Sequence, residues 1–571
     1  MADQPTPADP GQKKTSKSPQ TSQGKKVAQA TTSGEEASAL GILVALLIFV
    51  LIIAGAWATW TRGLGLLAVA ETALRVYTPL ILGCLLPLFL AAYWVGTPAK
   101  KTQKKPDGLP PVGSSSNPRQ KSQGGRPPRT GAAALAALLA LTGAGYTFTV
   151  HPYVVAKAYT ADTVTDDAVT SFADRAPWIV ANNYAQRDQG DVIGDREDVH
   201  YVPAAQDAQA KAGDGTGQGT SRYTVLVKER GVLGTGGYEA VQTLTMPTTG
   251  TIPASASSFC PVPEQMGRRL ETTWPWYSLA WSIHARAPFA HWNKGDVYGY
   301  CEGDSPVVVV PLYRYEGFWK VTRVPNGAAV YTPEGMEVLS AAELVEADLA
   351  GPTYPRSLAK IQREAINAGG SLTQWWGSKY GYDLTDTDAE DANAQNPSEF
   401  TMVSAGDGAM SYVSPLTPRG SSQSITALSL VPAVQDGQGR AALTLNTATD
   451  LPATSTLVTA IKESSVQGDN AWTTRWSAGM SVYEILPAKD GHWAASIGQG
   501  QAVSYRADIS PQGQVTVVNA ETGQSSGRGA DSAESVTLDA GKPLSQMTEA
   551  ELLELIQQAA GELEQRQRSG N

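Results

Sequence analysis

The chain has 571 residues, of which 42% are hydrophobic and 17% charged, and its formal net charge is −10. Residues 1–150 hold 15 basic and 6 acidic side chains (net +9), whereas residues 151–571 hold 29 and 48 (net −19). This separation argues against a single soluble enzyme, and an acidic larger part argues against nucleic-acid binding, which uses basic surfaces. The length accommodates about three or four domains.

The first 61 residues divide into a polar tail and an apolar run. Residues 1–38 contain no aromatic side chain, so they cannot bury enough surface to offset the entropy of ordering, and we expect a disordered tail. Residues 39–61 carry no charge, and the run is long enough for a hydrocarbon core that needs about 20 residues. We therefore predict a first transmembrane helix at 39–61.

A second apolar run covers residues 76–96 and ends in Tyr93 and Trp94, which suit the aromatic belt of a membrane interface. We predict a second transmembrane helix there, the alternative being a buried helix of a soluble domain. Between the two spans, residues 62–75 contain Glu71 and Arg75 one helical turn apart. We expect a short interfacial helix with this pair facing the lipid headgroups.

A third apolar run at residues 131–150 is built from Ala, Leu and Gly. Ala136, Ala140 and Ala144 recur every four residues, a spacing that lets one helix approach another closely. An Ala-rich composition also produces this spacing by chance. We predict a third transmembrane helix whose small-residue face is a candidate pairing surface.

The distribution of basic residues sets the orientation. Lys and Arg are concentrated in the tail and in the linker at 97–130, which places both on the cytoplasmic side. Three spans then put the C-terminal region outside the cell, in a multi-pass protein of the plasma membrane. In a competing interpretation, residues 131–158 are an internal signal sequence that is cleaved after Ala158, which would release the outer part.

Cysteine usage agrees with an outer location. Cys84 lies inside a predicted span, whereas Cys260 and Cys301 are the two cysteines of the acidic part. In an oxidising compartment they form one disulfide, whose loop of about 40 residues contributes about 3 to 4 kcal/mol in the chain-entropy model. Two isolated cysteines lack the spacing of zinc ligands, so we predict no metal site and no cofactor.

The outer part is predicted to hold two domains. In the first, at 151–382, we expect one or two helices within 161–186, strands at 223–227, 238–244, 307–312 and 318–324, and helices at 340–349 and 358–368. An acidic linker at 383–398 separates it from a β-rich sandwich-like or barrel-like domain at 399–520. Its predicted strands are 410–416, 425–431, 442–445, 457–461, 482–485, 493–497, 503–509 and 515–518.

The C-terminal part combines a flexible linker at 521–545 with a helix at 546–568. Thr548 and Glu551 occupy capping-box positions, and Leu552, Ile556 and Leu563 lie along one helical face. This face either docks on the second domain or pairs with a partner or a second copy.

Catalytic motifs are scarce. The sequence contains no Walker A loop, H-E-x-x-H, C-x-x-C or complete G-x-G-x-x-G pattern, and the G-x-S-x-G string at 523–527 lacks the strand and helix of a nucleophile elbow. Two Asp-rich stretches, at 188–198 and 383–391, do not match an EF-hand loop, and solvated loops are the simpler explanation.

One segment gathers aromatic and imidazole side chains inside the predicted disulfide loop. It could line a cleft for a glycan or lipid, or it could form the core beneath the disulfide, which the large burial of Trp side chains favours. The candidate cleft residues are Trp274, Trp276, Trp281, His284, His291 and Trp292.

The expected fold class is therefore a membrane protein with three transmembrane α-helices, a β-rich α+β extracytoplasmic region and a C-terminal amphipathic helix. The leading functional hypothesis is a non-enzymatic, membrane-anchored scaffold or interaction protein, such as a subunit of a bacterial envelope or transfer assembly. Its expected partners are the lipid bilayer and other membrane proteins or further copies of itself. The alternative is a receptor that binds a glycan or lipid through residues 274–292, and the third hypothesis is an envelope hydrolase.

Overall fold

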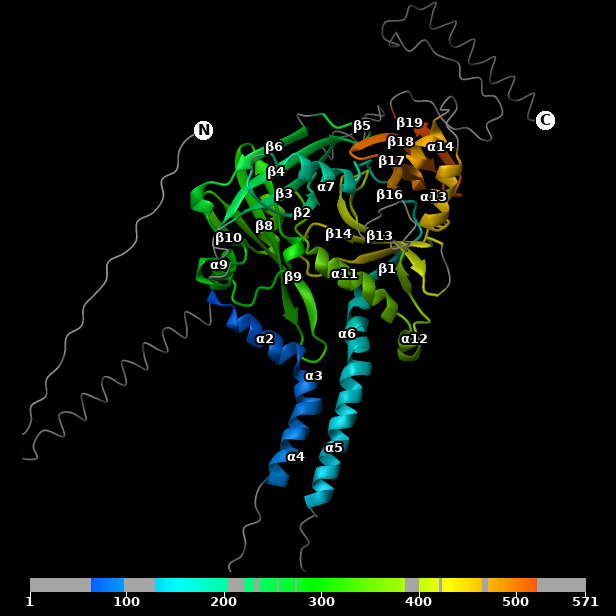
Figure 1. Ribbon diagram of the computed structural model, residues 1–571. Helices are drawn as coiled ribbons and strands as arrows, with labels where there is room; N and C mark the ends of the chain where they lie inside the picture. The colour runs from blue at the N-terminus through cyan, green and yellow to red at the C-terminus, as the bar shows by residue number, and fades with distance from the viewer. Residues whose placement is uncertain are drawn as a thin grey trace, which may run out of the picture. The chain divides into compact units, whose positions relative to one another are not determined.

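The computed structural model describes ten segments of the chain: residues 63–96, 129–190, 192–203, 220–230, 236–253, 256–272, 275–385, 400–420, 424–464 and 471–520. They form a β-rich α+β fold with four sheets (Figure 1). The tail at 1–38, the predicted span at 39–61, most of the basic linker and everything after residue 520 lie outside these segments. The C-terminal helix with Leu552, Ile556 and Leu563 therefore stays a prediction.

Two helical stretches contain the other predicted spans. The first runs through α2 (Leu66–Val76), α3 (Thr78–Leu80), η1 (Ile81–Leu85) and α4 (Leu86–Gly96). The second runs through α5 (Arg129–Gly145), η2 (Tyr146–Val150), α6 (His151–Tyr159) and η3 (Thr160–Asp162).

These stretches differ in how well they fit a membrane. Ala134–Asp162 forms one helix of 29 residues that is long and apolar enough to cross a bilayer. In the other stretch, Leu66–Val76 and Thr78–Tyr93 meet at a bend of 53°, so this pair is a second candidate if the two parts count as one span. The described residues thus contain one or two candidate spans, and the three predicted spans are not confirmed.

Helices α4 and α5 lie side by side (Figure 1). In η1, just before α4, Gly83 touches Gly143 of α5 through the backbone: a Cβ on Gly143 would lie 1.8 Å from the carbonyl oxygen of Gly83. On the same face of α5, Ala140 is buried and Ala136 and Ala144 are half-buried. Close packing through small residues is a common way for membrane helices to associate.

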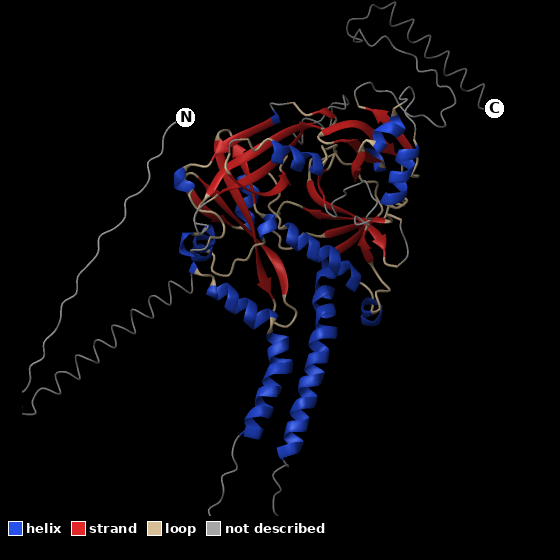
Figure 2. Ribbon diagram, in the orientation of Figure 1, coloured by secondary structure: helices blue, strands red, loops and turns tan. Residues whose placement is uncertain are grey.

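The four sheets are shown in red in Figure 2. Two of them, β2-β3-β4-β6 and β10-β9-β8-β7, are antiparallel. Their strands are β2 (Gly194–Tyr201), β3 (Thr220–Glu229), β4 (Tyr238–Pro247), β6 (Ser257–Pro261), β7 (Tyr298–Glu302), β8 (Ser305–Glu316), β9 (Thr322–Thr332) and β10 (Gly335–Leu339).

The other two sheets draw mostly on later residues. One has the order β1-β15-β14-β13-β11, with β12 also paired to β13, and the other has the order β16-β17-β18-β19, with β5 also paired to β18. Their strands are β1 (Thr163–Asp166), β5 (Gly250–Thr251), β11 (Tyr382–Leu384), β12 (Phe400–Val403), β13 (Met410–Pro418), β14 (Ala427–Pro432), β15 (Leu443–Asn446), β16 (Ser481–Pro487), β17 (Trp493–Gln499), β18 (Ala502–Ile509) and β19 (Val515–Asn519).

Short helices complete the fold. They are α7 (Trp178–Arg187), α9 (Leu279–Arg286), α10 (Ala341–Ala347), α11 (Arg356–Ala365), α12 (Leu372–Trp376), α13 (Thr454–Glu463) and α14 (Trp472–Ser477), with 3₁₀ turns η6 (Glu264–Met266), η7 (Pro275–Tyr277), η8 (Lys294–Asp296), η9 (Ile366–Ala368) and η10 (Lys489–Gly491). A capping box at Ser340 and Glu343 begins α10.

Two predicted strands differ from the structure. The strand predicted at 318–324 covers the turn after β8, and β9 begins only at Thr322. Residues 457–461 belong to α13, in which Leu457, Val458 and Ile461 are buried along one side. Short apolar runs fit both a strand and a helix, and here the spacing of these three residues over one turn decides for the helix. Within 161–186, the first two residues end η3, β1 follows, and the next α-helix begins only at Trp178.

Strands and ion pairs connect the two sides of the predicted linker at 383–398. Strand β1 pairs with β15, and β5 pairs with β18. Arg175 forms a fully buried ion pair of 2.9 Å with Glu484, whose second oxygen accepts a 2.7 Å hydrogen bond from the backbone N of Trp178. Removing one partner of such a pair typically costs about 3 to 5 kcal/mol. The division into two domains at this linker stays a prediction.

The contact between Gly83 and Gly143 gives a first testable prediction. Gly143→Leu should push α4 and α5 apart by roughly 2 Å, because its side chain has no room against the opposite backbone. Gly145→Leu is the matched control, since a Cβ there meets nothing within 4 Å. Spin labels at Leu88 and Leu138, both exposed, report the separation. Equal separations in the two variants would contradict close packing at Gly143.

Candidate functional site

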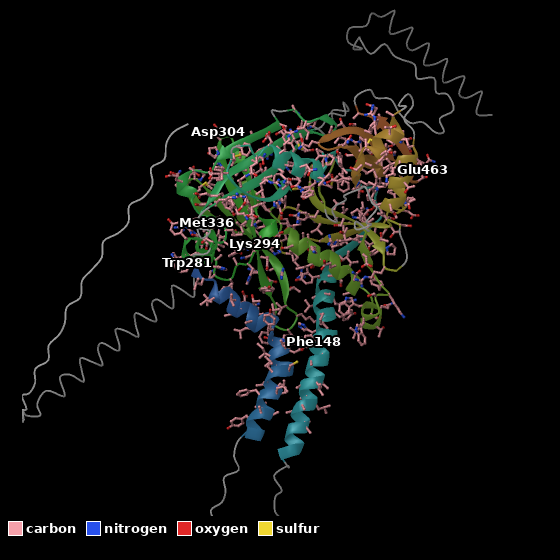
Figure 3. All side chains as sticks on the ribbon, viewed as in Figure 1. Phe148, Trp281, Lys294, Asp304, Met336 and Glu463 are labelled. Carbon is pink, nitrogen blue, oxygen red and sulfur yellow. A yellow bond between two sulfur atoms is a disulfide. The ribbon has the colours of Figure 1, made fainter. Side chains whose placement is uncertain are left out.

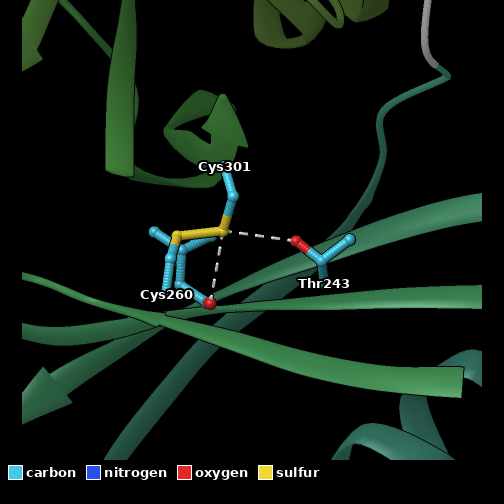
Figure 4. The surroundings of a disulfide bond; sticks show 4 residues. Thr243, Cys260 and Cys301 are labelled. Carbon is cyan, nitrogen blue, oxygen red and sulfur yellow. Dashed lines mark hydrogen bonds between the residues drawn. A yellow bond between two sulfur atoms is a disulfide. The ribbon is translucent and has the colours of Figure 1, made fainter. Parts of the chain in front are cut away.

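The disulfide predicted from the sequence joins Cys260 on β6 to Cys301 on β7 (Figure 4). The S–S distance is 2.03 Å, and the hydroxyl of Thr243 on β4 lies 3.5 Å from the sulfur of Cys301. The bond links the β2-β3-β4-β6 sheet to the β10-β9-β8-β7 sheet. It therefore fixes the ends of the loop that carries the aromatic and imidazole segment.

The structure distributes the candidate cleft residues over several environments. Trp274 lies outside the described residues. Trp276 in η7 is 43% exposed, whereas Trp292 packs against the buried cluster beneath the disulfide. Trp281 and His284 lie on α9, and the backbone of His291 bridges to Tyr313 on β8. The two cavities described below are lined by other residues.

Part of this segment is covered by the chain that leads into α2. A Cβ on Gly63 would lie 2.1 Å from the ring of Trp281, and a Cβ on Gly65 would lie 2.3 Å from Nε2 of His284. Gly65 also has φ +66°, which favours glycine. The backbone of residues 63–65 is therefore in direct contact with α9, on which Trp281 is marked in Figure 3.

Helix α2 continues this contact through Glu71 and Arg75. The two form the predicted ion pair, with 3.0 Å between Arg75 Nε and Glu71 Oε1. Arg75 also donates hydrogen bonds to the carbonyl oxygens of Tyr315 (3.2 Å) and Gly317 (3.0 Å). Arg75 thus contacts the β8–β9 hairpin, and the expectation that this pair faces the lipid headgroups stays a prediction.

His291 is the group opposite Glu71. Its Nε2 lies 3.6 Å from Glu71 Oε2, and the His291 and Glu71 side chains are only 15% and 9% exposed. The His291 ring stacks on Tyr313 and meets the edge of Tyr315. Glu71 Oε2, His291 Nε2 and His284 Nδ1 are buried without a hydrogen-bond partner.

Burial controls the protonation of both imidazoles. It lowers the pKa of His284 to about 4, and burial together with the charges of His284 and Arg323 lowers the pKa of His291 to about 4. Both rings are therefore neutral at pH 7. We call the set formed by Glu71, Arg75, His284, His291 and Trp281 the α2 seat.

A second site is a cavity of about 450 Å³. His200 is buried there, with no hydrogen-bond partner at Nε2, and burial, followed by the charge of Arg356, lowers its pKa to about 3. Asp296 accepts hydrogen bonds from the backbone and hydroxyl of Ser357. The remaining lining residues are Arg175, Trp178, Asp198, Val199, Tyr201, Asn293, Gly295, Pro352, Lys360, Thr401 and Tyr412.

The lining of this cavity is polar and carries both signs of charge, and it comes from both sides of the predicted linker. Sequence reasoning missed it because its residues follow no motif spacing. A second cavity, lined in part by Asp195, Glu197, Lys228 and Lys294, also has mixed charge.

Neither metal chemistry nor relatives identify the chain. Across the described segments, no group of three or more His, Cys, Asp or Glu side chains is placed to hold a metal ion. No protein-family model, curated protein or solved structure matches the sequence. Any function must therefore be argued from the geometry.

The α2 seat predicts a pH dependence of stability. An unfolded chain takes up protons on His284 and His291 near pH 6.5, whereas the folded chain takes them up only near pH 4. The stability that the neutral rings contribute is therefore complete above about pH 6.5 and is lost as the pH falls toward 4. The double variant His284→Gln/His291→Gln should show a shallower fall of the melting temperature.

The control is His492→Gln, because His492 is exposed and pairs with Asp508 on β18, and neither residue belongs to the α2 seat. Melting temperatures of the full-length protein in detergent, measured from pH 4 to pH 7, make the comparison. A double variant with the same pH profile as the unmodified chain would show that the two imidazoles do not titrate as described.

Proposed function

We propose that this chain is a non-enzymatic, membrane-anchored interaction protein with a β-rich extracytoplasmic region. It has three transmembrane helices, at 39–61, 76–96 and 131–150, and its basic tail and linker lie on the cytoplasmic side of the plasma membrane. One observation carries the proposal. The helix Ala134–Asp162 has an exposed apolar surface along its first half, and its last turn is buried in the core of the β-rich region.

The outer surface of α4 and α5 supports the membrane assignment. Large apolar side chains on both helices are exposed, among them Leu88, Phe89, Leu138 and Leu141. Phe148, marked in Figure 3, continues this surface along η2. Soluble proteins rarely expose a contiguous apolar surface of this kind to water, whereas lipid acyl chains can cover it without a free-energy penalty.

The C-terminal end of the same helix is fixed to the β-rich region. Tyr159 is buried with Tyr354 and Leu358, and its hydroxyl accepts a 2.7 Å hydrogen bond from the backbone N of Arg323. Just beyond, Arg440 pairs with Asp162 at 2.6 Å. Cleavage after Ala158 would cut the helix beside this buried tyrosine, so these contacts favour a mounting that stays intact.

A fixed mounting suits a subunit of an assembly. A binding module that only needs to reach its ligand can be connected to the membrane by a flexible linker. A subunit of an assembly must present its contact surface to its neighbours in a fixed position and orientation relative to the membrane. Contacts through α2 and α6 together hold the β-rich region at two separate points. We therefore favour protein contacts, with other membrane proteins or with further copies of this chain.

A receptor is the second candidate because Trp276 and its neighbour Tyr277 are exposed, at 43% and 54%. If they bind a glycan, Trp276→Ala should abolish retention on cell-wall polysaccharide without changing the fold. The hydrolase hypothesis requires His284 or His291 to face a carboxylate or Ser across a cleft, and the carboxylate that faces His291 is the largely buried Glu71.

The anchoring is tested by labelling intact cells with a membrane-impermeant maleimide. In a Cys84→Ser background, Asp304→Cys, at an exposed turn, should be labelled from outside, and Ser115→Cys should be labelled only after lysis. Cys260 and Cys301 are protected by their disulfide. Labelling of position 115 in intact cells would overturn the orientation.

The interaction role is tested on the same membranes by amine crosslinking followed by native sizing. A species larger than the monomer is expected, and it should persist in Trp276→Ala. A monomer alone, together with loss of polysaccharide retention in Trp276→Ala, would favour the receptor instead.

A further inference from the structure

Two segments of the β-rich region carry exposed aromatic side chains. The turn between β8 and β9 carries Phe318, which is 63% exposed, and Trp319. Helix α12 ends in Trp376, which is 72% exposed, and Tyr380 follows it. Exposed Trp and Phe side chains at two separate loops need a physical explanation, because each leaves a large apolar surface in water.

The first loop touches the membrane helix near the end of the predicted span at 131–150. The indole N–H of Trp319 donates a 2.8 Å hydrogen bond to the hydroxyl of Tyr146, and the two rings are stacked. The backbone oxygen of Trp319 accepts a 3.0 Å hydrogen bond from Nε2 of His151. These contacts place Phe318, the neighbouring residue, beside the outer end of the span.

The second loop touches the same helix about two turns further on. The ring of Trp375 packs on Tyr153, whose hydroxyl donates a 2.8 Å hydrogen bond to the carbonyl oxygen of Gly370. Lys157 donates a 2.7 Å hydrogen bond to the carbonyl oxygen of Gly369. In Figure 1, α12 lies close to α6, and the β8–β9 turn lies near α3.

Both loops therefore contact the same helix within about two turns of each other. Tyr146 and Tyr153 are seven residues apart, or about 10 Å along a helix, and the headgroup region is about 5 to 8 Å deep on each side of the hydrocarbon core. Trp and Tyr are enriched in this region because their rings are apolar and their polar edges can stay hydrated. Lys320 and Lys379 are exposed beside the aromatic residues, where they can pair with anionic headgroups.

We propose that the β8–β9 turn at 317–320 and α12 with Tyr380 form a membrane-facing rim. Phe318, Trp319 and Trp376 enter the headgroup region of the outer leaflet. The rim rests on the proposed membrane anchoring and extends it, because it makes the β-rich region itself a lipid-binding surface. Lipid is the occupant that the observations favour, since the rim is continuous with the apolar surface of the helix pair.

The test places an environment-sensitive fluorophore at single cysteines in the full-length Cys84→Ser protein, reconstituted in nanodiscs of phosphatidylcholine and phosphatidylglycerol. Phe318→Cys and Trp376→Cys report the rim, and Trp319 is kept because it contacts Tyr146. Leu141→Cys, on the exposed face of α5, reports the span. Asp304→Cys is the exposed control on β-rich surface away from the helices in Figure 3.

Nitroxide lipids labelled at the headgroup should quench positions 318 and 376 about threefold more strongly than position 304. Lipids labelled deep in the acyl chain should quench position 141. If 141 is quenched but 318 and 376 behave like 304, the rim is wrong and the anchoring stands. If 141 is not quenched either, the anchoring itself fails.

A protein occupant gives a different result. Positions 318 and 376 would then be shielded from aqueous iodide as well as from lipid nitroxides, and the shielding would grow with protein concentration. That outcome would overturn the rim and assign the loops to a contact between copies of the chain.

Discussion

The structure depends on one unbroken helix. Residues 134–162 begin with an exposed apolar surface and end with Tyr159 buried among residues of the β-rich region. Because a helix is stiff over this length, whatever holds its first half also orients everything packed on its second half. If lipid surrounds the first half, the sheets cannot turn independently of the membrane. The function proposed above follows from this restraint.

A second restraint comes from the stretch that leads into α2. Gly63 and Gly65 lie against α9, and Arg75 donates hydrogen bonds to the backbone of the β8–β9 hairpin. The β-rich region is thus held both through α6 and through α2. The segment that the sequence marked as a cleft or a core therefore has a further role, because the start of α2 and the residues before it pack against it.

Local sequence patterns predicted much of this fold, but they did not predict contacts between residues that are far apart in the sequence. The pairing of Cys260 with Cys301 followed from there being one available partner in the acidic part, and the helix predicted at 340–349 followed from a helical pattern over a few residues. The strand assigned to 457–461 failed because a short apolar run fits either structure. The contact of Glu71 with His291 joins residues far apart in the chain. No local pattern encodes it, and the polar cavity around His200 was missed for the same reason.

The central claim is that the β-rich region is fixed relative to the membrane helices. Spin labels at Leu138, on the exposed face of α5, and at Asp304, on an exposed turn of the β-rich region, measure this directly in full-length protein held in nanodiscs. The account predicts one narrow distance distribution. A broad distribution, as a flexible tether would give, would contradict it.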